Sequence, residues 1–305
     1  MKRKRIAIPE AQLATWSGRG AVTNSSASYN SVRTAVLNSQ SRVATLNPEI
    51  FLQGSYRNAT NIFGDSDVDA VVLMNTVFFK DVSALDAHQQ QLQRGAYASA
   101  VYGWAEFRAD VLQTLRAYYG NGRVRERDRC IKVDFGAGRI AADVIPAVQH
   151  RKYGYFYSET VQSYVEGIEF RDRAGTAVVN FSKQHIANGE LKNAQERTNG
   201  WFKASVRMFK NARNRLIDNR AIPADSCSSY HLECLVYNAP DFLFGRTFQD
   251  TFESVLNYWA HTIQPATSLC QNGITPLFGT SPVQWNIPHA SQFVRGLQNL
   301  WQNWA

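Results

Sequence analysis

The sequence lacks several patterns that would place a protein in a familiar class. It has no run of about 18 consecutive apolar residues, so no membrane span is predicted. Its four cysteines form no C-x-x-C pair, and none has a histidine at the spacing of a zinc site. We therefore expect reduced thiols in a cytoplasmic protein, and neither a membrane protein nor a secreted precursor with a disulfide scaffold.

Signatures of several enzyme classes are also missing. There is no G-x-x-x-x-G-K-[ST] segment and no G-x-S-x-G segment, which disfavours a P-loop ATPase and a serine hydrolase. The six histidines include no H-x-x-x-H or similar ligand pair, and no internal repeat predicts a solenoid. A functional site must therefore be built from other residues.

The chain does contain enough apolar residues for a large core, and an excess of positive charge. Hydrophobic residues make up 44% of the 305 residues, as expected for one large globular domain or two of ordinary size. The formal net charge of +8 favours a polyanionic partner such as nucleic acid, anionic lipid or a nucleoside triphosphate. The basic run Lys2–Arg5 is typical of a solvated terminus, with a nucleic-acid arm as the alternative.

The first half of the chain predicts a sheet covered by helices. Residues 20–37 carry apolar side chains at helical spacing, and we expect a buried brace helix there. Residues 104–115 predict an amphipathic helix that covers the sheet and ends near Gly120. The predicted strands are 49–53, 67–74 and a hairpin of 131–135 with 139–145, whose second strand is expected to end at Pro146.

The second half predicts mainly helix. After one more hairpin around Gly175, the apolar periodicity is helical. The predicted helices are 201–216, 229–237, 247–263 and 289–304. We therefore expect an α+β protein with two lobes, residues 1–160 and 161–305, and a cleft between them.

An acidic pair opens the most informative strand. In the segment Gly64-Asp65-Ser66-Asp67-Val68-Asp69, the carboxylates of Asp67 and Asp69 point to one face of the strand, where a hard cation such as Mg²⁺ could bind. An acidic pair alone is common on solvated loops. Here, however, the pair leads into five apolar residues, and Gly54-Ser55 follows another strand, where backbone and hydroxyl could contact a phosphate. The pattern predicts a site for a metal-bound triphosphate.

A two-metal site needs a further carboxylate, and Asp134 and Asp143 are the candidates. Asp143 lies in an apolar strand, where a solitary acid costs several kcal/mol to bury unless it is paired or bound to metal. Asp134 lies nearer the turn and Arg139, where a surface ion pair explains it. The sequence favours Asp143 as the third ligand and keeps Asp134 as the alternative.

These motifs together resemble a known family. Gln53-Gly54-Ser55, Asp67-x-Asp69 and Asp143-Val144-Ile145-Pro146 are similar to the motifs of the CD-NTases, the bacterial cGAS/DncV-like nucleotidyltransferases. The segments 201–213 and 228–235 resemble clade E of that family, and the likeness spans nearly the whole chain. The resemblance implies a polymerase-β-like nucleotidyltransferase lobe, braced by the N-terminal helix and joined to a C-terminal helical lobe, with triphosphates bound between the lobes.

The resemblance also implies roles for three residues of the second half. Lys210 would neutralise the triphosphate, Ser229 would donate a hydrogen bond to it, and Tyr230 would stack on the donor base. The sequence alone allows a surface lysine, a helix N-cap and a core tyrosine instead. Because Ser228 precedes Ser229, the sequence leaves open which serine caps the helix and which binds phosphate.

Base choice is expected to depend on Asn180. By the resemblance, asparagine at this place goes with a pyrimidine preference, and its carboxamide can both donate to and accept from uracil. The alternative is an ordinary asparagine at a turn or strand end.

The implied activity is synthesis of a uridine-containing cyclic dinucleotide, cyclic UMP-AMP or cyclic di-UMP. The substrates would be UTP with ATP or a second pyrimidine triphosphate. Two Mg²⁺ ions, or Mn²⁺ in their place, would be held by Asp67, Asp69 and Asp143. The product would be an antiphage messenger read by a separate effector, with no membrane and no obligatory nucleic acid involved. The alternatives are an RNA-tailing nucleotidyltransferase and a catalytically silent nucleic-acid-binding protein.

Overall fold

The computed structural model describes residues 7–20, 23–38, 40–64, 67–136, 139–262 and 268–304. Outside these ranges lie the basic run Lys2–Arg5, Asp65 and Ser66 of the acidic motif, two residues of the predicted hairpin turn, and the predicted helix end Ile263. The chain forms two compact units. The sheet unit comprises Val22–Gln53 and Ser66–Ser182, and the helical unit comprises Met1–Ala21, Gly54–Asp65 and Lys183–Ala305.

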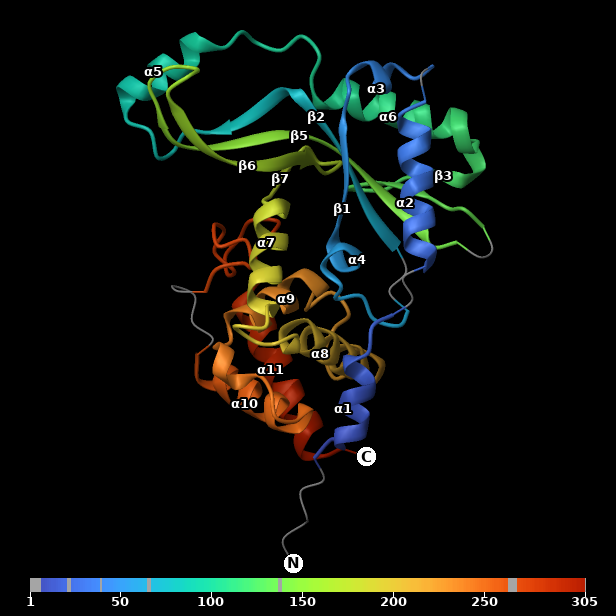
Figure 1. The fold of residues 1–305 in the computed structure, drawn as a ribbon, viewed down its shortest axis with the longest axis vertical. Helices are drawn as coiled ribbons and strands as arrows, with labels where there is room; N and C mark the ends of the chain where they lie inside the picture. The colour runs from blue at the N-terminus through green and yellow to red at the C-terminus, as the bar shows by residue number, and fades with distance from the viewer. Residues whose placement is uncertain are drawn as a thin grey trace, which may run out of the picture. The chain divides into compact units, whose positions relative to one another are not determined.

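The described strands of the sheet unit form one mixed sheet of seven strands (Figure 1). The main path runs β1-β2-β5-β4-β3, with β6 paired to β5 and β7 to β6; only β2 and β5 run parallel. The expected α+β class is confirmed. The strands are β1 (Glu49–Gln53), β2 (Asp67–Asp81), β3 (Val124–Glu126), β4 (Ile131–Val133), β5 (Ala141–Phe156), β6 (Gln162–Arg171) and β7 (Ala177–Asn180).

The expectation that Pro146 ends its strand is wrong, because β5 continues through it to Phe156. On one side, β5 pairs with β2 along most of its length. On the other side, the register with β4 ends at Val144 and that with β6 begins at Val148. Pro146 therefore falls between two partner strands, where the missing N–H removes no bond of either ladder.

Helices cover the sheet as expected. The predicted brace helix is α2 (Thr23–Val36), whose Ser28 hydroxyl donates to the Ile140 carbonyl at 2.6 Å and whose Tyr29 hydroxyl donates to the Ile50 carbonyl at 2.8 Å. Helix α6 (Trp104–Tyr119) lies beside α2 in Figure 1 and is followed by Gly120, with φ of 85°. The unit also contains α3 (Arg42–Thr45), a turn of 3₁₀ helix (Asn121–Arg123) and α5 (Ala87–Ala96), which the sequence did not predict.

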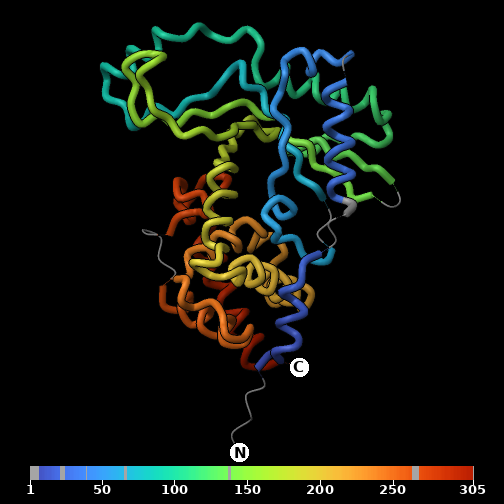
Figure 2. The backbone as a smooth tube through the Cα atoms, in the orientation of Figure 1, coloured from blue at the N-terminus to red at the C-terminus, as the bar shows by residue number. Residues whose placement is uncertain are grey.

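The helical unit encloses an aromatic core. Phe209 stacks on Phe252 with ring centroids 4.8 Å apart, and it lies 4.7 Å from the ring of Trp259. Figure 2 follows the chain through this unit. Its helices are α1 (Glu10–Ser17), α4 (Gly54–Asn58), α7 (Ser182–Asn193, starting at the unit boundary), α8 (Trp201–Asp218), α9 (Ser229–Asn238), α10 (Phe248–Thr262) and α11 (Ile287–Gln302), with a 3₁₀ turn at Asp241–Leu243.

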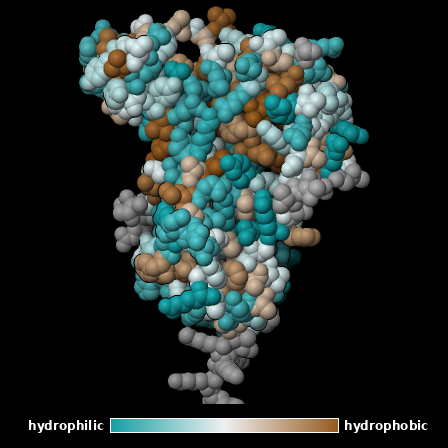
Figure 3. All heavy atoms as spheres, viewed as in Figure 1, coloured by the Kyte–Doolittle hydropathy of each residue, from teal (hydrophilic) through white to brown (hydrophobic). Residues whose placement is uncertain are grey.

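The units do not divide at residue 160, where the sequence predicts a boundary. Strands β6 and β7 continue the sheet, so the sheet unit extends to Ser182. The N-terminal helix α1 joins the helical unit, where both carboxylate oxygens of Glu10 accept hydrogen bonds from the first turn of α10. No described helix has the length and apolar character needed to cross a membrane. In Figure 3, hydrophilic atoms cover most of the visible face, and the brown patches lie mainly on the sheet unit.

Candidate active site

Strand register brings the predicted carboxylates together in the sheet unit. Asp69 on β2 lies opposite Asp143 on β5, and Asp67 precedes Asp69 by two residues. Residues in register on neighbouring strands, and residues two apart on one strand, point to the same face of a sheet. The three carboxylates therefore share one face. The same row continues to Gln53 on β1, opposite Asp69, and to Lys132 on β4, opposite Asp143.

Asp143 is the least satisfied member of this row. Its Oδ1 atom is buried and has no hydrogen-bond partner. Burial raises the pKa of Asp143, and the nearby charge of Asp67 adds to this, while a hydrogen bond from the Cys130 thiol and the charge of Lys132 oppose it. Beside them, burial and the three carboxylates raise the pKa of the Cys130 thiol to about 12. A concentration of negative charge with an unused oxygen is a site that a cation would stabilise.

Lys132 supplies the nearest positive charge. Its ammonium lies 2.8 Å from Oδ2 of Asp67, and this hydrogen bond raises the pKa of Lys132. As the side chains stand, the described His, Cys, Asp and Glu residues include no group of three close enough to share one ion. The row still fits a hard cation, because it offers carboxylate oxygens and a buried, unpartnered one.

Asp134, the alternative third ligand, lies outside the paired strands that carry this row of residues. It follows β4 on an exposed loop, and its Oδ1 accepts a hydrogen bond from the backbone N–H of Gly136 at 3.0 Å. A carboxylate that closes its own turn needs no metal to explain it. The register thus supports Asp143, and its role as metal ligand stays a prediction.

The predicted phosphate motif begins where β1 ends. The Gln53 side chain accepts a hydrogen bond from the Ser182 hydroxyl at 2.8 Å. Gly54 has φ of 70°, a left-handed conformation that favours glycine. The chain then forms α4 and closes with the Thr60 N–H donating to the Ser55 carbonyl at 3.0 Å. We call residues 54–60 the phosphate turn, after its predicted role.

Lys210 lies in the interior of the helical unit. It is completely buried on α8, and its ammonium donates to the Thr60 carbonyl at 2.9 Å, at the end of the phosphate turn. The alternative of a snorkelling surface lysine is therefore wrong. Its predicted contact with a triphosphate is untested, and its position ties it to the turn that carries Gly54 and Ser55.

The two serines before α9 have different partners. The Ser228 side chain is the N-cap and accepts from the His231 N–H at 3.1 Å. The Ser229 hydroxyl accepts instead from Nη1 of Arg213 at 3.0 Å. A hydroxyl that accepts a hydrogen bond keeps its own proton to donate. Ser229 therefore remains suited to a phosphate oxygen, and Ser228 is the capping residue.

Tyr230 is partly buried on α9. Its ring stacks on the His185 imidazole, with centroids 5.4 Å apart and planes 22° from parallel. Burial raises the pKa of its phenol, so the hydroxyl stays protonated. The ring thus has a fixed orientation, as a base-stacking platform requires.

Asn180 ends β7, half-buried and opposite Ile168 of β6. The adjoining Gly167 is constrained, because a Cβ atom there would lie 2.9 Å from the Asn180 carbonyl oxygen. The backbone position of Asn180 is therefore fixed by close strand packing. The alternative of a strand-end asparagine describes its location correctly, and its role in base choice stays a prediction.

No role for Glu233, His185 or Lys132 was predicted from the sequence. Glu233 is almost fully buried, as is His185. The sequence did contain a signal for Glu233, because it is an acidic residue inside the apolar run Leu-Glu-Cys-Leu-Val. It also follows Tyr230 by three residues and so lies on the same side of a helix. Lys132 gave a weaker signal, since alternating charge is ordinary on an exposed strand.

Known proteins are similar to this chain over nearly its whole length. Residues 187–302 match the family described as the cGAS/DncV-like nucleotidyltransferase C-terminal helical domain. The cyclic UMP-AMP synthase of Rhodothermus marinus is 42% identical over 302 residues, covering 98% of this chain and 99% of that protein. The cyclic nucleotide synthase CdnE01 of Staphylococcus haemolyticus is 36% identical over 305 residues, covering 98% and 100%.

The fold is similar over the same extent. The solved structure of the Rhodothermus marinus CdnE c-UMP-AMP synthase with Apcpp and Upnpp has a TM-score of 0.85 to this chain and 42% sequence identity. It covers 98% of both chains. Sequence and structure therefore agree along nearly the entire length.

Proposed function

We propose that the product of this chain contains uridine and is made by two-metal nucleotidyl transfer. The premise is that the chain belongs to the CdnE group of the cGAS/DncV-like nucleotidyltransferases and is a cyclic dinucleotide synthase of that kind. The observation that carries the proposed chemistry is the register of Asp69 with Asp143, which puts two carboxylates and Asp67 on one face. No protein nucleophile is needed for transfer between bound nucleotides.

Asp67, Asp69 and Asp143 would hold two Mg²⁺ ions, or Mn²⁺, which supply Lewis acidity at the acceptor hydroxyl and at the donor triphosphate. Gln53, Gly54 and Ser55 would orient the triphosphate, with Lys210 and Ser229 offering positive charge and a hydroxyl donor. Tyr230 would hold the donor base by stacking. The first transfer releases pyrophosphate and leaves a linear dinucleotide that keeps one triphosphate, and a second transfer closes the ring and releases a second pyrophosphate.

The proposed substrates are UTP with ATP, or with a second pyrimidine triphosphate. The similarity to a protein named cyclic UMP-AMP synthase supports this, as does the carboxamide of Asn180, which can pair with both edge groups of uracil where a serine can pair with fewer. An unpaired polar group on the base costs on the order of 1–3 kcal/mol, which is tenfold to a hundredfold in selectivity.

The test is to supply each labelled NTP in turn with Mg²⁺ and identify the nuclease-resistant product. Wild type should incorporate uridine, and Asn180→Ser should shift incorporation toward purines while total turnover stays similar. A wild-type product made only of purines, or an unchanged ratio in Asn180→Ser, would show that Asn180 is an ordinary strand-end residue. Extension of added RNA in place of a small cyclic product would identify a tailing enzyme.

The family likeness further supports a role for the product as an antiphage second messenger that a separate effector reads. Infection of cells that carry the wild-type gene or an Asp69→Asn variant tests this. Protection by the wild type alone is the expected result.

A further inference from the structure

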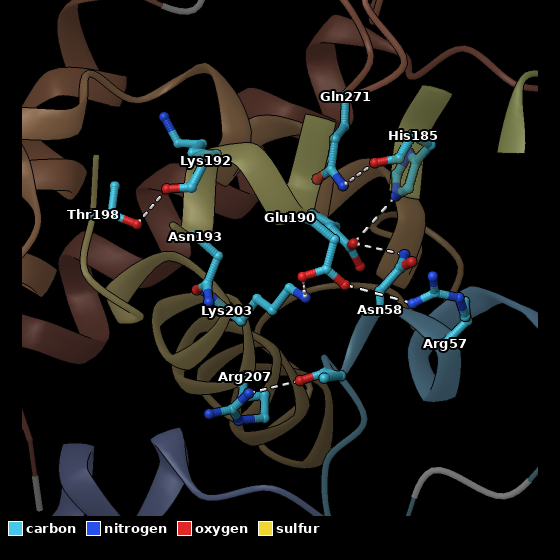
Figure 4. Close-up of polar contacts among 12 residues, drawn as sticks. Arg57, Asn58, His185, Glu190, Lys192, Asn193, Thr198, Lys203, Arg207 and Gln271 are labelled. Atoms are coloured by element: carbon cyan, nitrogen blue, oxygen red, sulfur yellow. Dashed lines mark hydrogen bonds and ion pairs between the residues drawn. The ribbon is translucent and has the colours of Figure 1, made fainter. Parts of the chain in front are cut away.

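Glu233 lies at the centre of a buried hydrogen-bond network in the helical unit. Its Oε1 accepts from Nδ2 of Asn58 at 2.9 Å and lies 3.1 Å from Nε2 of His185. Its Oε2 accepts from the Thr60 hydroxyl at 2.9 Å. In Figure 4, the labelled side chains of Asn58, from α4, and His185, from α7, lie close together. One side chain thus gathers three donors from two separate segments.

The donors belong to the parts of the unit that are expected to bind nucleotide. Asn58 and Thr60 complete the phosphate turn, whose Ser55 carbonyl accepts from the Thr60 N–H. His185 stacks on Tyr230, which precedes Glu233 by three residues and so lies on the same side of α9. The Glu233 carboxylate therefore connects the turn with the stacking ring.

The charge of Glu233 is well compensated. Burial would raise its pKa, but the hydrogen bond and charge of His185, the charge of Lys210 and the Thr60 hydroxyl together lower the pKa of Glu233 to about 2. Lys210 donates to the Thr60 carbonyl, so its charge acts at the same turn. Glu233 is ionised at neutral pH, and charge-assisted hydrogen bonds of this kind are the stronger ones.

We propose that Glu233 is a positioning residue: its carboxylate holds the phosphate turn and, through His185, the Tyr230 ring in the one arrangement that receives a nucleoside triphosphate. This inference rests on the proposed function of Ser55 and Tyr230. A carboxylate is required because all three partners present hydrogen-bond donors to it, and a glutamine would turn its own NH₂ group toward one of them.

The test compares Glu233→Gln with Glu190→Gln. Glu190 also contacts the phosphate turn, through Arg57 at 3.5 Å, and it pairs with Lys203 at 2.7 Å, but its side chain is 51% exposed (Figure 4). Binding of a non-hydrolysable UTP analogue should weaken about tenfold in Glu233→Gln and less than about twofold in Glu190→Gln. In nucleotide-free protein, amide hydrogen exchange of residues 54–60 should accelerate only in Glu233→Gln.

A stability control separates positioning from a general structural role. Val255→Ala removes buried volume from the core on α10, away from these hydrogen bonds, and should lower Tm with UTP-analogue affinity unchanged. His185→Phe keeps a flat ring against Tyr230 and loses the bond to Glu233, so it should weaken binding in the same direction as Glu233→Gln. Equal affinities in Glu233→Gln and Val255→Ala would overturn the proposal.

If Glu233→Gln does not fold, Thr60→Val removes a single donor at nearly constant volume. It should weaken analogue binding about threefold and accelerate exchange in residues 54–60, and wild-type values for both would overturn the proposal. Neither measurement requires turnover. Absence of a cyclic product from wild type would therefore contradict the proposed function alone, while binding and exchange still decide the role of Glu233.

Discussion

Asp143, which is partly buried, and Glu233, which is almost fully buried, are two carboxylates with opposite surroundings. Asp143 keeps a buried oxygen without a partner, and burial raises its pKa. Both oxygens of Glu233 accept hydrogen bonds, and its pKa is lowered to about 2. The difference teaches that burial alone does not identify a ligand site. A carboxylate that the fold leaves unsatisfied is suited to a cation, whereas a satisfied one organises its neighbours.

The largest expected effect follows from the unsatisfied carboxylate. Asp143→Asn, like Asp67→Asn or Asp69→Asn, should lower product formation on the order of a thousandfold, because metal stabilisation of the transition state is worth several kcal/mol. Since the raised pKa of Asp143 means that its charge is unfavourable in the folded state, Asp143→Asn should leave Tm unchanged or higher. Chromatography of products and thermal unfolding measure both.

Asp134→Asn is the matched control for that substitution. It removes only an exposed turn contact and should keep activity within about twofold of wild type. Loss of activity in Asp134→Asn with normal turnover in Asp143→Asn would transfer the third-ligand role to Asp134.

The next largest effect concerns the satisfied carboxylate. Lys210→Ala should lower the free energy of unfolding by about 3 kcal/mol, because it leaves the buried Thr60 carbonyl without this donor and Glu233 without a nearby positive charge. Urea denaturation measures this, alongside the dependence of rate on NTP concentration. A raised NTP requirement with unchanged unfolding would instead make Lys210 a triphosphate ligand with no part in the network.

A smaller effect is expected where a lysine competes with metal. Lys132→Met frees the Asp67 carboxylate and should tighten Mg²⁺ binding to the nucleotide-free protein about fivefold, or about 1 kcal/mol, measured by calorimetry. Lys152→Met is the control, since Lys152 on β5 forms a similar ion pair at 2.6 Å with Asp81, at the opposite end of β2 from Asp67. Equal Mg²⁺ affinity in wild type and Lys132→Met would show that Lys132 does not compete for the carboxylates.

The smallest effect separates the two serines of α9. Ser228→Ala removes the N-cap and should lower the free energy of unfolding by about 0.5–1 kcal/mol, with little change in NTP use. Ser229→Ala should do the reverse, raising the NTP requirement with nearly constant stability. The opposite pair of results would exchange the two assignments.

The sequence was informative where the signal is local. Strand β1, the D-x-D pair, Gly120 after α6 and the apolar stripes of α8 to α11 were predictable from neighbouring residues. The register of Asp69 with Asp143 was not, because it depends on pairing between strands separated by α5, α6, β3 and β4. The prediction that Pro146 ends its strand was wrong for the same reason, because the effect of a proline depends on which partner strands flank β5 at that point.

Residues whose role depends on distant partners were the ones missed. Nothing near Glu233 in the sequence shows that Asn58 and Thr60 supply its donors, 175 and 173 residues away. Lys210 was recognised by resemblance, but its complete burial could not be read from a helix that carries four other basic residues, of which Arg215 is exposed. Such contacts appear only when the chain is folded.

The helical unit is assembled from three separate stretches of chain, and this limits how the protein can be divided. A fragment spanning residues 187–302 would match a recognised domain, yet it would lack His185, Asn58 and Thr60. In such a fragment, Glu233 would be ionised among apolar residues and would have lost its hydrogen-bond donors. The first turn of α10 would also lack the two hydrogen bonds that Glu10 accepts from it. The domain recognised by sequence is thus not a module that can be excised or exchanged between relatives, and chimeras should transfer residues 7–20, 54–64 and 183–186 along with it.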